Sequence, residues 1–366
     1  MKDIHITIAT GIFPPSIGGP ASYSKMLLDF LGPYGYDVTI VTFDSVRKYP
    51  KIIRHIMYFF LLCKHSISSD ILYAQDPVSV GLPALCVAKL FRKPLMVRLG
   101  GDYAWEQAVG RFGCTDTLDD FVTKKQPYIY VRMLQSIQRY VVSHSQATVV
   151  PSAYLKRIVT QWGIDEQILH VIYNAFTPPD VRKKNIHRKT FTIVTVGRLV
   201  PWKGFATLID TVVTLHTSYP HVTLTIIGDG IDKEMLEKKI QQAHAESYIQ
   251  MKGALSKDAV YTELSCADAF VLFTSYEGFS HLILEAMSIG VPILTTAVGG
   301  NTEILRDMDN ALLIPHSTEH LEKGLRRMID DSELRERIAT EAQKNVAVYT
   351  EDKMFAELDM LIRKHI

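Results

Sequence analysis

The chain lacks several features that identify common protein classes. Its four cysteines, Cys63, Cys86, Cys114 and Cys266, lie far apart and form no CxxC pair. This spacing excludes a zinc cluster and a disulfide framework, and it favours a reducing, cytoplasmic location. Neither an HExxH motif nor a compact group of histidines and cysteines occurs, so these common metal-site patterns are missing as well.

An excess of charge of one sign is also missing. The chain has 40 Lys and Arg against 39 Asp and Glu, which gives a formal charge of +1. We therefore expect no nucleic-acid partner, and any anion site must be local. The longest plainly apolar stretch, "IMYFFLLC" at 56–63, is far shorter than the roughly 20 residues that cross a membrane. The amino terminus lacks the apolar segment and cleavage site of a signal peptide.

Apolar sequence is nevertheless plentiful, because 47% of the 366 residues are hydrophobic. Single cores usually stop growing near about 250–300 residues, so we expect two domains. Short β-rich runs alternate with helix-length segments, which predicts parallel sheets covered on both faces and two Rossmann-like halves. These runs are "IHITIAT", "DVTIVTF", "DILYA", "PLMVRLG", "ATVVPS" and "ILHVIYN", then "FTIVTVG", "VTLTIIG", "DAFVLFTS", "VPILTT" and "ALLIP".

The boundary between the two halves is predicted from a break in the pattern. Residues 177–190, "TPPDVRKKNIHRKT", have two prolines, a basic run and no periodicity. We expect an N-terminal domain over 1–176, a linker over 177–190 and a C-terminal domain over 191–349. Parallel sheets bind ligands outside the carboxyl ends of their strands, so we expect a cleft between facing domains.

The first strand-to-helix turn, "TGIFPPSIGGPASYS", contains Gly18 and Gly19 before a helical run. Paired glycines let backbone amides approach a ligand, and a helix N-terminus favours negative charge. The pair therefore marks either a phosphate contact or simply a tight turn. It is not GxGxxG, which argues against a nicotinamide enzyme.

The second half opens with "TVGRLVPWKGFATLID". Arg198 follows a strand directly, and Lys203 comes five residues later near a helix start. Arg offers a planar fork and Lys a compact charge, and together they would neutralise a diphosphate. The alternative is that both are ordinary solvated surface residues.

Two acids flank the apolar run in "TSYEGFSHLILEAMSIGVP", residues 274–292. The pattern predicts a strand, a turn holding Glu277, and a helix with Ser280 as N-cap and Gly290 as terminator. The amides of residues 279–281 would face an anion while Glu277 and Glu285 reach hydroxyls on either side of it. A nucleotide sugar has this layout. Alternatively, Glu285 is an exposed helix residue and Glu277 satisfies the turn.

Taken together, these segments resemble the retaining glycosyltransferases of family 4, which have the two-domain GT-B fold. The resemblance spans nearly the whole chain and includes the family's E-x7-E signature as Glu277 and Glu285. It also rests on these stretches: "PPSIGG", "VIYNAF", "VGRLVPWKG", "IIGDG" and "EGFSHLILEAMSIGVPILTT".

The resemblance implies a role for each matching position. Arg198 and Lys203 would hold the donor diphosphate, Glu285 the ribose hydroxyls and Glu277 the transferred sugar. Gly18 and Gly19 would close over the donor from the other domain. Asn174 would lie where the chain leaves the first domain, and the final helix, 350–366, would return to pack on it. Backbone amides would assist from Gly278, Phe279, Ser280, His281 and Leu282.

The sequence departs from the family pattern in two places. Ser280 and His281 replace a glycine and an apolar residue, so His281 is either a ligand contact or a tolerated helix-start residue. In "PLMVRLGGDYAWEQ" a glycine stands where many members carry a histidine near the reacting sugar. Asp102 is the nearest ionisable replacement, with Glu106 behind it, and its role as hydroxyl binder or acceptor base is open.

The function implied is retaining transfer of a hexosyl group from a nucleotide sugar to an acceptor hydroxyl, without a metal or other cofactor. The acceptor would be a glycan or a lipid-linked molecule, in glycan, glycolipid or glycoconjugate synthesis. The alternatives are a nucleotide-sugar epimerase of the same fold and a non-catalytic nucleotide-sugar-binding protein. "DMD" at 307–309 imitates a metal motif but reads as a helix end and turn. Asp229, in "GDG", is a turn residue or a neighbour of the base or ribose.

One segment suggests a membrane contact. Residues 47–65, "RKYPKIIRHIMYFFLLCKH", combine five Lys or Arg residues with an apolar run. A basic amphipathic helix of this kind can lie on an anionic membrane, which would place the protein peripherally on its inner face and suit a lipid-linked acceptor. The other interpretation is a helix that covers the sheet and has a basic entrance.

Overall fold

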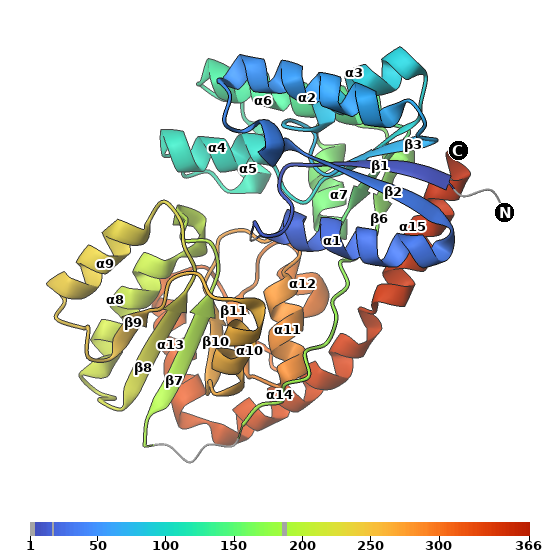
Figure 1. Ribbon diagram of the computed structural model, residues 1–366. Coiled ribbons are helices and arrows are strands. Elements are labelled where there is room, and N and C mark those ends of the chain that lie inside the picture. Colours follow the sequence, from blue (N-terminus) through green and yellow to red (C-terminus); the bar gives the residue numbers. More distant parts are fainter. Residues whose placement is uncertain (1–3, 17, 185–188) are drawn as a thin grey trace. The chain divides into compact units, whose positions relative to one another are not determined.

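The computed structural model describes residues 4–16, 18–184 and 189–366 of the chain (Figure 1). It divides into two compact units, each built on one sheet. The N-terminal unit comprises Met1–Asn174 and Glu351–Ile366, and the C-terminal unit comprises Ala175–Thr350. Part of the expected linker, 185–188, lies outside the described residues. The stretch before it is tied to the C-terminal unit, because the amides of Lys183 and Lys184 donate to Ile289 and Ser265.

The N-terminal unit contains a six-stranded sheet in the order β2-β1-β3-β4-β5-β6, with parallel pairing throughout. Its strands coincide with the six β-rich runs of the first half, because buried β-branched and aromatic residues favour that state. They are β1 (Ile4–Thr10), β2 (Tyr36–Thr42), β3 (Ile71–Ala74), β4 (Leu95–Arg98), β5 (Ala147–Val150) and β6 (Leu169–Val171).

Helices cover both faces of this sheet (Figure 1). A buried cluster joins one face to α2, α3 and α6, which contribute Tyr58, Leu85 and Val141 among others. The hydroxyl of Ser24 on α1 donates to Thr10 at the end of β1. The helices are α1 (Gly19–Leu31), α2 (Lys51–Ser66), α3 (Gly81–Phe91), α4 (Tyr103–Phe112), α5 (Leu118–Thr123), α6 (Ile129–Ser143), α7 (Ala153–Thr160) and α15 (Glu351–Lys364).

The terminal helix α15 belongs to the N-terminal unit. Phe355 is fully buried and stacks on Phe30 of α1, with ring centroids 4.6 Å apart. Asp359 accepts a hydrogen bond of 2.6 Å from the Tyr36 hydroxyl. Helix α15 therefore completes the packing of a unit whose other residues end at Asn174.

The C-terminal unit repeats the architecture with the order β12-β11-β10-β7-β8-β9, again parallel. The prediction of two doubly wound parallel sheets is thereby confirmed. The sequence pattern missed only the short strand β9. The elements are β7 (Phe191–Val196), α8 (Phe205–His216), β8 (Val222–Ile227), α9 (Lys233–Gln242), β9 (Ile249–Met251), α10 (Lys257–Ser265), β10 (Ala269–Leu272), α11 (His281–Ile289), β11 (Ile293–Thr296), α12 (Asn301–Ile304), β12 (Leu312–Ile314), α13 (Thr318–Asp330) and α14 (Ser332–Asn345).

Each strand order contains one point where the chain reverses its direction of growth across the sheet. In the C-terminal sheet this point lies between β7 and β10, and in the N-terminal sheet between β1 and β3. In open parallel sheets, ligands bind at such a point, outside the carboxyl ends of the strands. The fold thus singles out one edge position in each unit as a place for a ligand.

Candidate functional site

The loops after β7 and β10 meet at the reversal point of the C-terminal sheet. Gly204 permits this approach, because its φ is +63° and a Cβ there would stand 2.3 Å from the carbonyl oxygen of Phe273. The Thr274 hydroxyl donates to the carbonyl oxygens of Trp202 and Tyr276, at 3.0 and 2.8 Å. The Ser275 amide donates to Trp202 as well. The two loops are therefore locked together before any ligand binds.

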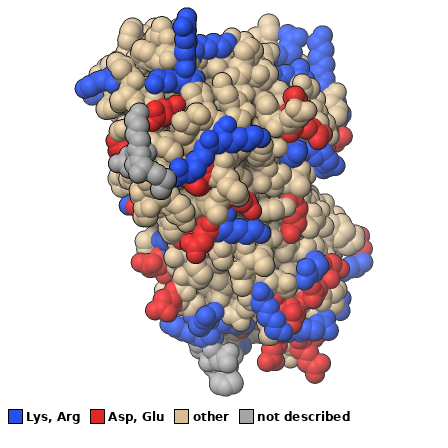
Figure 2. Space-filling view, turned by 90° about the vertical axis from the view of Figure 1, so that its right-hand side faces the viewer, with Lys and Arg blue, Asp and Glu red and all other residues tan. Residues whose placement is uncertain are grey.

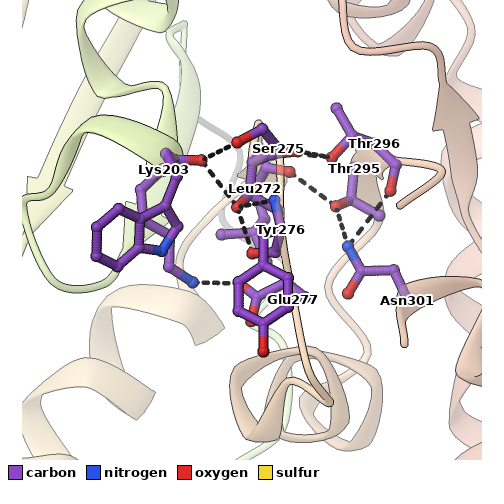
Figure 3. Close-up of polar contacts among 10 residues, drawn as sticks. Lys203, Leu272, Ser275, Tyr276, Glu277, Thr295, Thr296 and Asn301 are labelled. Carbon is purple, nitrogen blue, oxygen red and sulfur yellow. Dashed lines mark hydrogen bonds and ion pairs between the residues drawn. The ribbon is translucent and has the colours of Figure 1, made fainter. Parts of the chain in front are cut away.

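The contact between the two loops brings Lys203 and Glu277 together as an ion pair. Lys203 ends a short 3₁₀ turn, Pro201–Lys203, that follows β7, and Glu277 lies in the turn after β10. Their side chains are only 12% and 11% exposed, and the ammonium donates to Oε1 of the carboxylate. Figure 3 shows the two side chains pointing toward each other beside the end of β10. Sequence analysis placed both at the site, and the structure brings them together.

Backbone contacts from the loop after β11 fix the position of Glu277. The Gly300 amide donates to the Glu277 carbonyl at 2.9 Å. At Gly299, φ is +53° and a Cβ would stand 2.2 Å from that carbonyl oxygen. Asn301, fully buried, donates to Thr295 and Thr296 at the end of β11 (Figure 3). The loops after β7, β10 and β11 thus fix the position of Glu277 together.

Helix α11 begins directly after this turn. Ser280 occupies its N-cap position, as predicted, but the serine side chain makes no capping hydrogen bond. Gly290 ends the helix with φ +88°, also as predicted. The first amides of a helix have no intrahelical acceptor and carry partial positive charge. This partial positive charge and the Lys203 ammonium are together suited to an anion.

Glu285 lies on the buried side of α11 and is only 7% exposed. Its Oε1 accepts a hydrogen bond of 3.0 Å from the Tyr261 hydroxyl and lies 3.6 Å from the Lys257 ammonium. Burial raises the pKa of the Glu285 carboxyl, while Lys257 and Tyr261 oppose that change. The exposed-helix alternative for Glu285 is wrong, because the side chain is buried and held by α10. Sequence reasoning missed Tyr261 and Lys257, since no local pattern links α10 to α11.

The other predicted positions surround this core of the site. Arg198 is exposed and stands over the Trp202 ring, 5.6 Å from its centroid. Phe279 is buried and meets the Tyr349 ring edge-on. Gly278 is buried, while His281 and Leu282 are half-buried at the start of α11.

Asp229 and the "DMD" stretch occupy turns. The Asp229 carboxylate accepts from the Gly230 amide, and its carbonyl accepts from Leu199 in the loop after β7. Asp307 accepts from the Leu313 amide, and Asp309 pairs with Arg306. Within the described ranges, no three His, Cys, Asp or Glu side chains converge as metal ligands.

The predicted residues of the N-terminal unit lie at separate places on its sheet edge. Gly18, with φ +152°, precedes α1, which starts at Gly19 without a side-chain cap. Glu106 lies in the first turn of α4. Asn174 is buried and accepts a hydrogen bond of 2.8 Å from Arg98.

Asp102 is the N-cap of α4. Its Oδ1 accepts from the Trp105 amide at 2.9 Å and from Gln138 at 3.2 Å, and its Oδ2 is buried with no hydrogen-bond partner. Burial raises the pKa of the Asp102 carboxyl to about 6, although these two hydrogen bonds oppose the shift. A buried acid that titrates near neutrality fits proton transfer, and it also fits a purely structural cap.

Sequence reasoning missed a buried polar group at the reversal point of the N-terminal sheet. Arg98, at the end of β4, is 6% exposed and lies 3.7 Å from the centroid of the Tyr23 ring on α1. Among the described residues, no carboxylate forms an ion pair with it. Gln75, following β3, is 4% exposed, and its two side-chain polar atoms have no partner. A polar residue directly after an apolar strand, as in "MVR" and "LYAQ", is the signal that would have found them.

Two family models match adjoining parts of the chain. Residues 15–178 match the family model described as Glycosyltransferase Family 4, and residues 177–345 match the one described as Glycosyl transferases group 1. Over 141 residues, 38% of this chain, the sequence is 30% identical to the GtfA subunit of a UDP-N-acetylglucosamine–peptide N-acetylglucosaminyltransferase from Streptococcus pneumoniae. That match covers 27% of the relative's length. The chain spans 26–59% of the lengths of the first curated relatives that it matches.

Solved structures match over nearly the whole chain. Sucrose-phosphate synthase from Thermosynechococcus elongatus superimposes with a TM-score of 0.84 at 14% identity, covering 99% of this chain and 98% of the other. Anabaena HepE in complex with UDP-glucose gives a TM-score of 0.77 at 17% identity, covering 99% and 100%. At these identities the likeness shows the fold alone, and that fold is GT-B.

Proposed function

Because the chain belongs to the family 4 glycosyltransferases of group 1, we propose that it transfers a hexosyl group from a nucleotide sugar to an acceptor hydroxyl with retention of configuration. The observation that carries the proposal is the Lys203–Glu277 pair beside the start of α11, at the reversal point of the C-terminal sheet. A cation, the partial positive charge of a helix start and an acid together match a diphosphate that bears a hydroxylated sugar.

In this proposal the unliganded pair is the resting form of the donor site. An ammonium has three donors, so Lys203 can keep Glu277 as a partner while it also contacts a diphosphate oxygen. Arg198, standing on Trp202, extends over the same loop and would hold the second phosphate. The Glu285 carboxylate, which already accepts a hydrogen bond from the Tyr261 hydroxyl, would also accept hydrogen bonds from the ribose hydroxyls.

The chemistry needs stabilisation of the leaving group. The bond from the anomeric carbon to the phosphate oxygen breaks while an acceptor oxygen bonds to that carbon, so negative charge grows on the diphosphate. Lys203, Arg198 and the α11 amides oppose that charge, and one preorganised partner of this kind is worth about 3–4 kcal/mol of barrier. Retention would follow from attack on the same face, with the acceptor proton passing to the leaving phosphate. A covalent sugar trapped on Asp102 or Glu277 would contradict this route.

The donor proposed first is a UDP-hexose or a UDP-N-acetylhexosamine. The supporting facts are that a fold relative binds UDP-glucose and that a sequence relative is named for UDP-N-acetylglucosamine. In the N-terminal unit, Asp102 is proposed as the group that binds and orients the acceptor hydroxyl, because its Oδ2 has no hydrogen-bond partner.

A thermal-shift panel of UDP-, GDP- and ADP-sugars tests the donor site. One donor should raise the melting temperature, and Lys203→Ala or Arg198→Ala should abolish most of the shift. Lys239→Ala is the matched control, because it removes a lysine from an ion pair with Asp210 on the same unit. If the donor still raised the melting temperature after the loss of Lys203, the proposed diphosphate contact of this residue would be contradicted. Consumption of the donor without an acceptor, yielding an altered donor, would identify an epimerase instead.

A further inference from the structure

The outer surface of α2, α3 and α6 has an unusual composition. The segments 45–69, 77–101 and 121–143, which contain these three helices, include no Asp or Glu, although the whole chain has 39. The first segment has five Lys or Arg residues and the second has four. The formal charge of +1 therefore conceals a strongly cationic part of the N-terminal unit.

These helices lie side by side on one face of the sheet, with α2 packed on α3 and α3 on α6 (Figure 1). Their inner sides belong to the core, where the fully buried Tyr58 donates to the Val41 carbonyl at 2.8 Å. Lys89 on α3 joins the outer sides, because its ammonium donates to the Tyr140 hydroxyl of α6 at 2.9 Å. The expected sheet-covering role of residues 47–65 is thus confirmed, and their outward side needs a separate explanation.

That outward side is apolar to a degree found nowhere else in the described chain. Fifteen large apolar side chains of the described residues are exposed, and nine belong to these helices or to the residues flanking them. On α2 they recur at helical spacing: Ile53 is 49% exposed, Ile56 51% and Phe60 63%. The others are Ile67, Leu90, Tyr128, Ile129, Met133 and Tyr140.

Cations lie among these apolar side chains. Lys64, Lys89, Arg92 and Arg139 are exposed on the three helices or next to them. Figure 2 shows Lys and Arg side chains along the upper edge of the N-terminal unit, where these helices lie in Figure 1. We call this surface, formed by the nine apolar residues and four cations, the α2–α3–α6 face.

We propose that the α2–α3–α6 face binds the surface of an anionic lipid bilayer. Apolar side chains between cations match the interface of such a bilayer, where chains and rings enter below the headgroups while Lys and Arg contact the phosphates. No helix in the described part of the chain is long and apolar enough to cross a membrane. The protein would therefore lie on the bilayer, holding the N-terminal unit against it.

Charge and apolar surface together favour a bilayer over two other occupants, a second copy of the chain and nucleic acid. A second copy that used the same patch would set cations against cations with no acid to pair them, which disfavours a symmetric dimer. Nucleic acid would satisfy the cations but would leave Ile56, Phe60 and Ile129 without an apolar environment. A bilayer with acidic headgroups supplies both partners at once.

Vesicle flotation with the full chain tests the proposal without any donor or acceptor, so its result is independent of the proposed activity. The protein should float with vesicles of equal parts phosphatidylcholine and phosphatidylglycerol, and much less with phosphatidylcholine alone. Ile56→Ser combined with Phe60→Ser should reduce binding about tenfold, and so should Lys64→Gln combined with Arg139→Gln.

The matched controls are Ile231→Ser with Met235→Ser and, for charge, Lys238→Gln. Ile231 and Met235 are 67% and 46% exposed in the C-terminal unit, and these changes should leave binding intact. Unchanged melting temperatures would show that the variants fold. Failure to float with anionic vesicles, or equal loss in the controls, would overturn the proposal. A wild-type dimer in sedimentation that dissociates in the Phe60 variant would identify a second copy as the occupant instead.

Discussion

At the scale of single residues, the candidate site depends on acids whose environments differ. Glu277 is paired with Lys203, whereas Glu285 is buried against Tyr261 and Asp102 is buried with one oxygen unpartnered. Burial raises the pKa of the last two carboxyls. The pH responses of Glu285 and Asp102 can be separated by substitution.

Donor affinity should fall at acid pH because of Glu285. Its pKa is raised in the free protein, and ribose hydroxyls would donate to the carboxylate, so binding favours the deprotonated form. The dissociation constant of the nucleotide sugar should stay flat at alkaline pH and rise as pH falls through that raised pKa. Titration calorimetry between pH 8 and pH 5 measures it. In Glu285→Gln, binding should be weaker at neutral pH and lose this pH dependence, so an unaltered profile in the variant would refute the assignment.

Asp102→Asn should raise stability at neutral pH while reducing transfer. The pKa of the Asp102 carboxyl is raised from its ordinary value of 3.8 to about 6 in the folded protein, so the native state holds the extra proton between these values. Stability should then fall as pH rises through that window and stay level above it. Asparagine keeps the N-cap and cannot ionise, which should add about 1–3 kcal/mol at pH 7.

Denaturant unfolding at pH 4.5 and pH 7 compares Asp102→Asn with Asp102→Ala. The alanine variant also loses the cap, which costs about 0.5–2 kcal/mol. If Asp102 acts on the acceptor, both variants lose transfer activity although one is more stable. Full activity in the asparagine variant would leave Asp102 with a structural role only.

At the scale of elements, the site is a product of loops that touch at strand ends. The loop after β11 supports the turn that holds Glu277, and the loop after β7 supplies Lys203. None of these loops is long, and their positions follow from close backbone approach at glycines such as Gly204 and Gly299. The shape of the site is therefore sensitive to one added methyl group at these positions.

Gly299→Ala should weaken the donor site without unfolding the unit. The new Cβ would stand 2.2 Å from the Glu277 carbonyl oxygen, so the turn must move and the Lys203–Glu277 pair with it. We expect nucleotide-sugar affinity to fall about tenfold, which corresponds to about 1.4 kcal/mol. Gly163→Ala is the control, because Gly163 also has positive φ, +80°, but open space around its Cβ position. Calorimetry should find equal affinity for this control and the wild type.

At the scale of the whole molecule, the chain leaves the N-terminal unit after Asn174 and returns to it at Glu351. Stability of that unit consequently depends on residues 351–366, which are distant in sequence from the rest of it. Phe355, Leu358 and Ile362 are each fully buried there. The C-terminal unit, by contrast, is continuous in sequence and holds the Lys203–Glu277 pair.

Phe355→Ala should destabilise the N-terminal unit selectively. The change removes a fully buried ring that stacks on Phe30, and such truncations cost about 3–5 kcal/mol. Hydrogen exchange should become faster in β2 and α1 and remain unchanged in α11 and β10. Met360→Ala on the same helix is the control, because Met360 is 65% exposed. Equal acceleration in both units would contradict the assignment of α15.

The sequence by itself determined the fold class, eleven of the twelve strands that the structure describes, and the candidate residues Arg198, Lys203, Glu277 and Glu285 of the C-terminal unit. Local periodicity and strand-end position carry that information, as with Lys203 after β7 and Glu277 after β10. Only the tertiary structure decided which side chains meet. Tyr261 with Glu285, Arg98 with Tyr23, and the outward apolar side of α2, α3 and α6 all join residues distant in sequence, and no local pattern encodes such contacts.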